Sequence, residues 1–141
     1  MATTRSEEKL GKLGTSTVAL EFGTPDRSRF EPVRAVADSG ALFSWLPRNT
    51  PENLGHAPAL RRTFVLADGR EDERDVAEVP VRYGRETLST LCVFGEEETP
   101  ILGALTMEQF LVAPDPVHRR LIPIRGLALM AQRGEKIGAG L

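Results

Sequence analysis

A single carboxylate stands inside an apolar run of this sequence. Asp38 lies in the stretch AVADSGALFSWLP (residues 35–47), and only Ser39 and Gly40 beside it are small and non-aliphatic. A carboxylate can exchange protons with a bound water or substrate, which is general acid–base chemistry. A charge without a partner is costly to bury. Asp38 is therefore expected either at a surface turn, the commonest setting for such a triplet, or beside a partner supplied from elsewhere.

Two further features accompany the Asp38 triplet. Downstream, the apolar-apolar-glycine triplet Ile101-Leu102-Gly103 leads into a predicted helix. Between the two triplets, the turn Ala67-Asp68-Gly69-Arg70 separates two strand-like runs. Asp-Gly between such runs is a strong hairpin signal. This hairpin is long enough to act as a cover over Asp38.

Other chemistry is weakly represented. His56 and His118 are far apart in the sequence and lack metal-ligand spacing, so both are expected at the surface. Cys92 lies in a strand-like run and is expected to be a small core residue rather than a nucleophile. Asp115, followed by proline, is expected to form a turn that ends a helix. With no glycine-rich phosphate loop either, we expect no cofactor and no metal.

The bulk composition predicts one soluble globular domain. The chain has 141 residues, of which 40% are hydrophobic and 27% charged, and its net charge is −2. This balance gives no reason to expect a nucleic-acid or membrane partner. The N-terminal residues are polar and lack the apolar segment of a signal peptide, so a cytoplasmic location is expected.

Many short strands with closely spaced turns predict a mostly β barrel or sandwich. We expect a flexible leader over residues 1–14, a domain over 15–125 and a tail over 126–141. Within the domain, a helical turn is predicted over 50–55 and a helix over 104–112. The predicted strands are 15–22, 32–37, 42–46, 61–66, 76–83, 87–94, 100–103 and 119–124.

Taken together, these features resemble the retropepsin-like aspartic proteases, and most closely their small single-domain bacterial and archaeal members. The resemblance rests on AVADSGALFSWLP, on the hairpin LADGRE and on PILGALTMEQFLVAPDPVHRRLIPI. The last stretch is similar to the apolar-Gly-helix-Asp-Pro-Arg-Arg-Leu ending of that family. The resemblance covers Val18 to Ile124.

What the resemblance implies is an all-β, closed barrel with one short C-terminal helix, which acts as an aspartic endopeptidase on peptide or protein substrates. Two chains would form a homodimer, each supplying one Asp38, and the two carboxylates would share a proton. The ionised carboxylate would accept a proton from water while the protonated one donates to the scissile carbonyl. The N-terminal strand and Arg119–Ile124 would add dimer contacts.

The resemblance also implies supporting roles for the neighbours of Asp38. Around the catalytic loop, the supporting residues are Ser39, Gly40, Ala41, Ile101, Leu102 and Gly103. The serine hydroxyl would bond across the dimer axis, the alanine would leave the substrate path clear, and the two glycines would allow tight backbone packing. The flap that closes over the substrate would comprise Ala67, Asp68, Gly69 and Arg70.

Several residues depart from the family pattern. Ser39 stands where threonine is commoner, Ala37 where a larger aliphatic residue is usual, and Trp45 is large for its place. Residues 68–75 are nearly all charged, whereas viral flaps are apolar and glycine-rich. Two alternatives therefore stay open: a catalytically inactive binding or dimerisation module of the same fold, and a monomeric β-barrel subunit of an unrelated complex.

Overall fold

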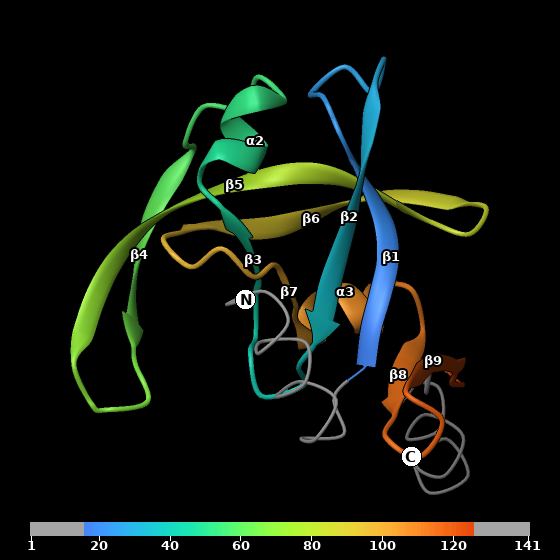
Figure 1. Cartoon of the computed structure of the whole chain (residues 1–141). Coiled ribbons are helices and arrows are strands. Elements are labelled where there is room, and N and C mark those ends of the chain that lie inside the picture. The colour runs from blue at the N-terminus through green and yellow to red at the C-terminus, as the bar shows by residue number, and fades with distance from the viewer. Residues whose placement is uncertain (1–15, 126–141) are drawn as a thin grey trace, which may run out of the picture.

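A computed structural model describes residues 16–125, which form nine strands and two short helices (Figure 1). The expected leader and tail lie outside the described residues. The strands are β1 (Ser16–Gly23), β2 (Phe30–Ala37), β3 (Ser44–Pro47), β4 (Leu60–Val65), β5 (Glu71–Tyr83), β6 (Glu86–Gly95), β7 (Ile101–Leu102), β8 (Val112–Asp115) and β9 (Arg120–Pro123). The helices are α2 (Asn49–Asn53) and α3 (Ala104–Gln109). The expected mostly β class is confirmed.

Seven strands form one sheet in the order β1-β2-β7-β3-β6-β5-β4, and β1 also pairs with β5. Two pairings are parallel: β2 with β7, and β3 with β6. These parallel pairings join segments that are far apart in the sequence, because parallel neighbours need a long connection. They bring the end of β2, which leads to Asp38, beside the predicted Ile101-Leu102-Gly103 triplet.

Alternation along the strands builds the core. In β1 the side chains of Ser16, Val18, Leu20 and Phe22 are buried, whereas Thr17 and Ala19 between them are exposed. This is the period of two that places every second side chain on one face of a strand. The β1 residues pack with apolar side chains of β5, β7 and α3 in one cluster, and Figure 1 shows α3 behind β2 at that level.

The predicted helix over 104–112 is too long. α3 ends at Gln109, Leu111 takes a left-handed conformation with φ 55°, and Val112–Asp115 forms β8 paired with β9. Pro114 and Pro116 lack backbone N–H groups and cannot continue a helix. Pairing with β9 instead satisfies the backbone of this segment.

The second arm of the predicted hairpin begins earlier than expected. The strand predicted over 76–83 begins at Glu71, and the charged residues 71–75 are strand residues of β5 paired with β4. Cross-strand pairing of opposite charges explains the difference, since Arg61 faces Asp75 and forms an ion pair with it at 2.8 Å. In Figure 1 this β4–β5 arm projects away from the rest of the sheet. Within residues 16–125, neither helix is long or apolar enough to cross a membrane.

Candidate active site

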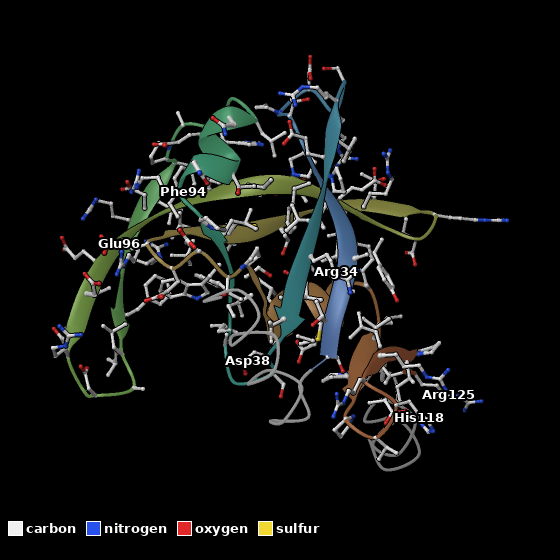
Figure 2. All side chains as sticks on the ribbon, viewed as in Figure 1. Arg34, Asp38, Phe94, Glu96, His118 and Arg125 are labelled. Carbon is white, nitrogen blue, oxygen red and sulfur yellow. The ribbon has the colours of Figure 1, made fainter. Side chains whose placement is uncertain are left out.

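Asp38 lies directly after β2, where β7 runs parallel to that strand. Val36 pairs with Ile101 and Ala37 with Leu102. The backbone N–H of Asp38 continues this ladder by donating to the carbonyl oxygen of Leu102 at 2.9 Å. The position of Asp38 is therefore fixed by the strand pairing and not by a flexible loop (Figure 2).

A tight turn presents the Asp38 carboxylate to solvent. Its Oδ1 accepts a hydrogen bond from the backbone N–H of Gly40 at 2.9 Å, and its carbonyl oxygen accepts one from Ala41 at 3.1 Å. Asp38, Ser39 and Gly40 are all exposed. A Cβ on Gly40 would lie 3.1 Å from Asp38 Oδ1, tighter than an ordinary contact. The turn thus keeps an accessible carboxylate in one orientation without burying its charge.

The segment after β7 supports this turn from beneath. Ala104 donates its N–H to the carbonyl of Ala41 at 2.7 Å, and Leu105 donates to Leu42 at 3.0 Å. A Cβ on Gly103 would stand 2.4 Å from the carbonyl oxygen of Phe43, so this position requires glycine. Leu102 is fully buried in the core. The two sequence triplets are thus brought together and joined by backbone hydrogen bonds.

Three buried hydroxyls beneath the site were missed by sequence reasoning. The Thr106 Oγ1 atom lies 2.7 Å from Ser44 Oγ and 2.7 Å from Thr90 Oγ1. Ser44 Oγ also accepts the backbone N–H of Gly103 at 3.0 Å. This hydroxyl chain links β3, β6 and the start of α3. Thr90, a polar residue in the otherwise apolar run TLCVF, was the available signal.

A cavity of about 150 Å³ opens beside Asp38. Its walls are formed by Asp38, Ala41, Trp45, Leu46, Gly95, Glu97, Thr99 and Ile101. Apart from Asp38, the one acid among them is Glu97, which is exposed. Trp45, expected either in the core or at a pocket, is half-buried and forms a cavity wall. A binding-sized hollow therefore adjoins the candidate catalytic carboxylate.

The β4–β5 arm contacts this region through aromatic side chains. The ring of Phe64 on β4 lies 5.1 Å from that of Trp45 and 5.8 Å from that of Phe43, measured between centroids. At the tip of the arm, Gly69 takes φ 87° and the Asp68 carboxylate accepts the N–H of Arg70 at 3.0 Å. Ala67 through Arg70 are exposed and lie outside the cavity walls.

Ion pairs tie the charged arm to the body of the protein. The Asp75 carboxylate binds Arg48 at 2.6 Å and Arg61 at 2.8 Å, and the hydrogen bond from Arg48 is the main cause that lowers the pKa of Asp75. Arg74 of the same strand binds Glu96 at 3.1 Å (Figure 2 labels Glu96). The charges of β5 are thus largely used in holding the arm.

The remaining candidate residues take structural positions. The prediction that His56 lies at the surface is wrong, because the ring is buried and its Nε2 lies 2.7 Å from the Gly23 carbonyl oxygen. His118 is exposed beside Asp115. Cys92 is fully buried, as expected, and burial raises the pKa of its thiol. Among residues 16–125, no three metal-ligating side chains gather at one point.

Comparison with known proteins finds similar solved structures but no similar sequence. No family model and no curated protein matches the sequence. The protease of Simian Foamy Virus (mac) matches with a TM-score of 0.51 and 15% identity, over 71% of this chain and 100% of that one. The EIAV protease, in complex with the inhibitor HBY-793, matches with a TM-score of 0.51 and 16% identity, over 68% of this chain and 88% of that one.

A retropepsin-like aspartic protease from Rickettsia conorii matches with a TM-score of 0.52 and 18% identity, over 74% of this chain and 87% of that one. At such low identities a structural likeness bears on the path of the chain and not on its chemistry. The chain therefore has the retropepsin-like fold.

Proposed function

We propose that this protein is an aspartic endopeptidase that acts as a homodimer. The observation that carries the proposal is the exposed Asp38 carboxylate, which is oriented by Gly40 and lies beside a cavity. The retropepsin-like fold supports this reading of the turn. One Asp38 per chain supplies half of a two-carboxylate site, so a second copy is required.

The chemistry follows from the proposed pairing of the two Asp38 side chains. Two carboxylates about 3 Å apart cannot both ionise readily, so they hold one proton between them. The ionised member accepts a proton from a water that attacks the peptide carbonyl. The protonated member donates to the carbonyl oxygen. The titration belongs to the pair and not to either residue.

The neighbouring residues then have distinct tasks in the proposed dimer. The Ser39 hydroxyl, which is exposed next to Asp38, bonds across the dimer axis and holds the two loops together. Gly40 leaves room for the water, and Ala41 leaves the substrate path clear. The segment Ile101-Leu102-Gly103 supports the loop from beneath, as its hydrogen bonds and packing allow.

The β4–β5 arm serves as the flap in this proposal. Its Phe64 lies against Trp45 at the cavity wall, while its tip at Ala67–Arg70 is exposed. Closure of the arm over an extended peptide would exclude water from the two carboxylates. In this proposal the sheet closes into a barrel, and the pairing of β1 with β5 supports that closure. β1 and Arg119–Ile124 offer further dimer contacts.

Peptide cleavage and subunit mixing test the proposal together. The protein is incubated with a mixture of unstructured peptides from about pH 4 to about pH 8, the range in which such a carboxylate pair changes protonation. We expect selective cuts that are absent with Asp38→Asn. Equimolar mixing of wild type with Asp38→Asn should lower the activity per wild-type chain to roughly half, because subunits exchange into mixed dimers.

The competing function is a binding or dimerisation module without catalysis. The observation that favours it is the charge on the arm, where Arg61, Asp72, Arg74 and Asp75 take part in ion pairs instead of forming an apolar cover. A folded, dimeric wild type that cuts no peptide at any pH would favour this module. A wild type that stays monomeric at high concentration would contradict the endopeptidase and would favour a monomeric subunit of an unrelated complex.

A further inference from the structure

We propose that the cavity beside Asp38 binds a basic side chain of the substrate, with Glu97 as its charge partner. The substrate class inferred is therefore a peptide with lysine or arginine next to the cleaved bond. This inference deepens the endopeptidase function proposed above and rests on it. It is carried by the cavity walls and by the ion pairs that Arg48 and Arg74 already form.

The cavity walls suit the methylene stem of a long basic side chain. Trp45, Ile101 and Ala41 present apolar surface beside the buried Leu46, and the volume of about 150 Å³ accepts one extended side chain. Lysine and arginine bury their stems along apolar surface and keep the charged head at a polar edge. Leu46 is fully buried and Trp45 is half-buried, so these walls belong to the packed body of the protein.

The position of Gly95 keeps this space open. A Cβ on Gly95 would lie 3.3 Å from Cε3 of Trp45, which is tighter than an ordinary contact, and 3.4 Å from the carbonyl oxygen of Leu46, which is an ordinary contact distance. Any larger side chain at this position would press on Trp45 or fill the hollow. The glycine thus places the end of β6 against the indole ring without closing the cavity.

Glu97 supplies the charge that distinguishes a basic from a neutral side chain. The nearby guanidinium groups already have carboxylate partners: Arg74 binds Glu96, and Arg48 binds Asp75. Among the described residues, Glu97 takes part in no such ion pair, although it lines the cavity. A bound ammonium or guanidinium would therefore meet a carboxylate that no cation among residues 16–125 neutralises.

A neutral side chain with the same four-carbon stem as lysine would be disfavoured for a second reason. Norleucine fits the same apolar walls, but its binding would remove water from Glu97 without offering a hydrogen bond in return. Removing water from an unpaired charge is costly. The discrimination therefore combines an attractive contact for lysine with a penalty against norleucine.

Paired peptides test the inference with two readouts. Peptides that differ only by lysine or norleucine next to the scissile bond are compared for kcat/KM, and their uncleavable reduced-amide forms are compared for Kd by calorimetry. For the wild type we expect roughly a tenfold preference for lysine in both quantities. The preference should shrink as salt is raised. In Glu97→Gln the ratio of kcat/KM for the lysine peptide to that for the norleucine peptide should fall to about one. Glu97→Lys should prefer a third peptide, with glutamate at the same position, over the lysine peptide.

Glu98→Gln is the matched control, since Glu98 is exposed on the same loop but does not line the cavity. It should keep the preference for lysine. Equal binding of the two uncleavable peptides by the wild type would overturn the inference, and so would an unchanged preference in Glu97→Gln. Loss of all cleavage in Glu97→Gln would also overturn it, because Glu97 would then belong to the chemistry. Peptide binding with a preference for lysine but no cleavage would support the pocket and contradict the endopeptidase.

Discussion

Gly103 lies so close to Phe43 that a Cβ at its position would stand 2.4 Å from the Phe43 carbonyl oxygen and 2.9 Å from the Ser44 nitrogen. Both neighbours are backbone atoms, which cannot move aside as the end of a side chain can. This contact joins the segment after β7 to the segment that follows the Asp38 turn. It makes the absence of a side chain at position 103 a condition for the geometry of the site.

Replacing Gly103 with alanine should therefore destabilise the protein. We expect Gly103→Ala to lower the free energy of unfolding by about 3 kcal/mol, at the upper end for an overpacked site, because the backbone must shift. Denaturant unfolding measures this loss. Gly69→Ala is a control without steric contact, since nothing lies near a Cβ there, although its positive φ adds a smaller local strain. Equal stability of wild type and Gly103→Ala would contradict the packing described.

The buried hydroxyl chain should be sensitive to a substitution that keeps shape and removes one polar group. We expect Thr106→Val to cost about 2 kcal/mol in the free energy of unfolding, since Ser44 and Thr90 would each lose a buried partner. The loss should be visible by thermal or urea denaturation. Thr63→Val on the exposed face of β4 is the matched control and should change stability by less than about 0.5 kcal/mol. Similar effects of both substitutions would indicate that the three buried hydroxyls contribute nothing to the free energy of unfolding.

Acid should weaken the link between the arm and Arg48, directly before α2, in a defined pH window. The Arg48 guanidinium holds the pKa of Asp75 below its ordinary value of 3.8. A carboxylate with a lower pKa in the folded than in the unfolded state stabilises above its unfolded pKa and loses this effect as pH falls through its folded pKa.

Wild type should therefore have a higher thermal midpoint than Asp75→Asn. This difference should be largest above about pH 5 and should vanish well below about pH 4. Differential scanning fluorimetry across this range measures it. Glu98→Gln, which alters an exposed acid outside the ion pairs described, serves as the control. A difference that stays constant down to about pH 2 would show that the ionised form of Asp75 is not what stabilises the arm.

The β4–β5 arm should depend on Phe64 for its contact with the body of the protein. Aromatic pairs of this kind contribute about 1 kcal/mol beyond their buried area. In Phe64→Ala we expect faster amide hydrogen exchange over residues 60–76 and a higher KM for any cleaved peptide. Val65→Ala is the matched control, because Val65 is 72% exposed on the same strand. Equal exchange in the two variants would show that the ring does not anchor the arm.

The sequence alone determined the strand pattern and the neighbours of Asp38. Alternating apolar residues located most strands, because a side-chain period of two is a local property. Asp-Gly located the tip of the arm, since a left-handed glycine is a local requirement of the turn. The residues beside Asp38 limited it to two settings, a surface turn or a place beside a partner supplied from elsewhere, because a buried charge without a partner would be costly.

Only the tertiary structure decided which distant residues meet. Charged residues 71–75 form strand because Asp75 finds partners on β4 and after β3, and a local reading of charge cannot supply those partners. His56 can be buried because its ring Nε2 forms a hydrogen bond with the carbonyl oxygen of Gly23. The hydroxyls of Ser44, Thr90 and Thr106, and the approach of Glu97 and Trp45 to one cavity, likewise depend on long-range pairing. Polar groups and charges are satisfied by neighbours in space, whereas sequence patterns report neighbours along the chain.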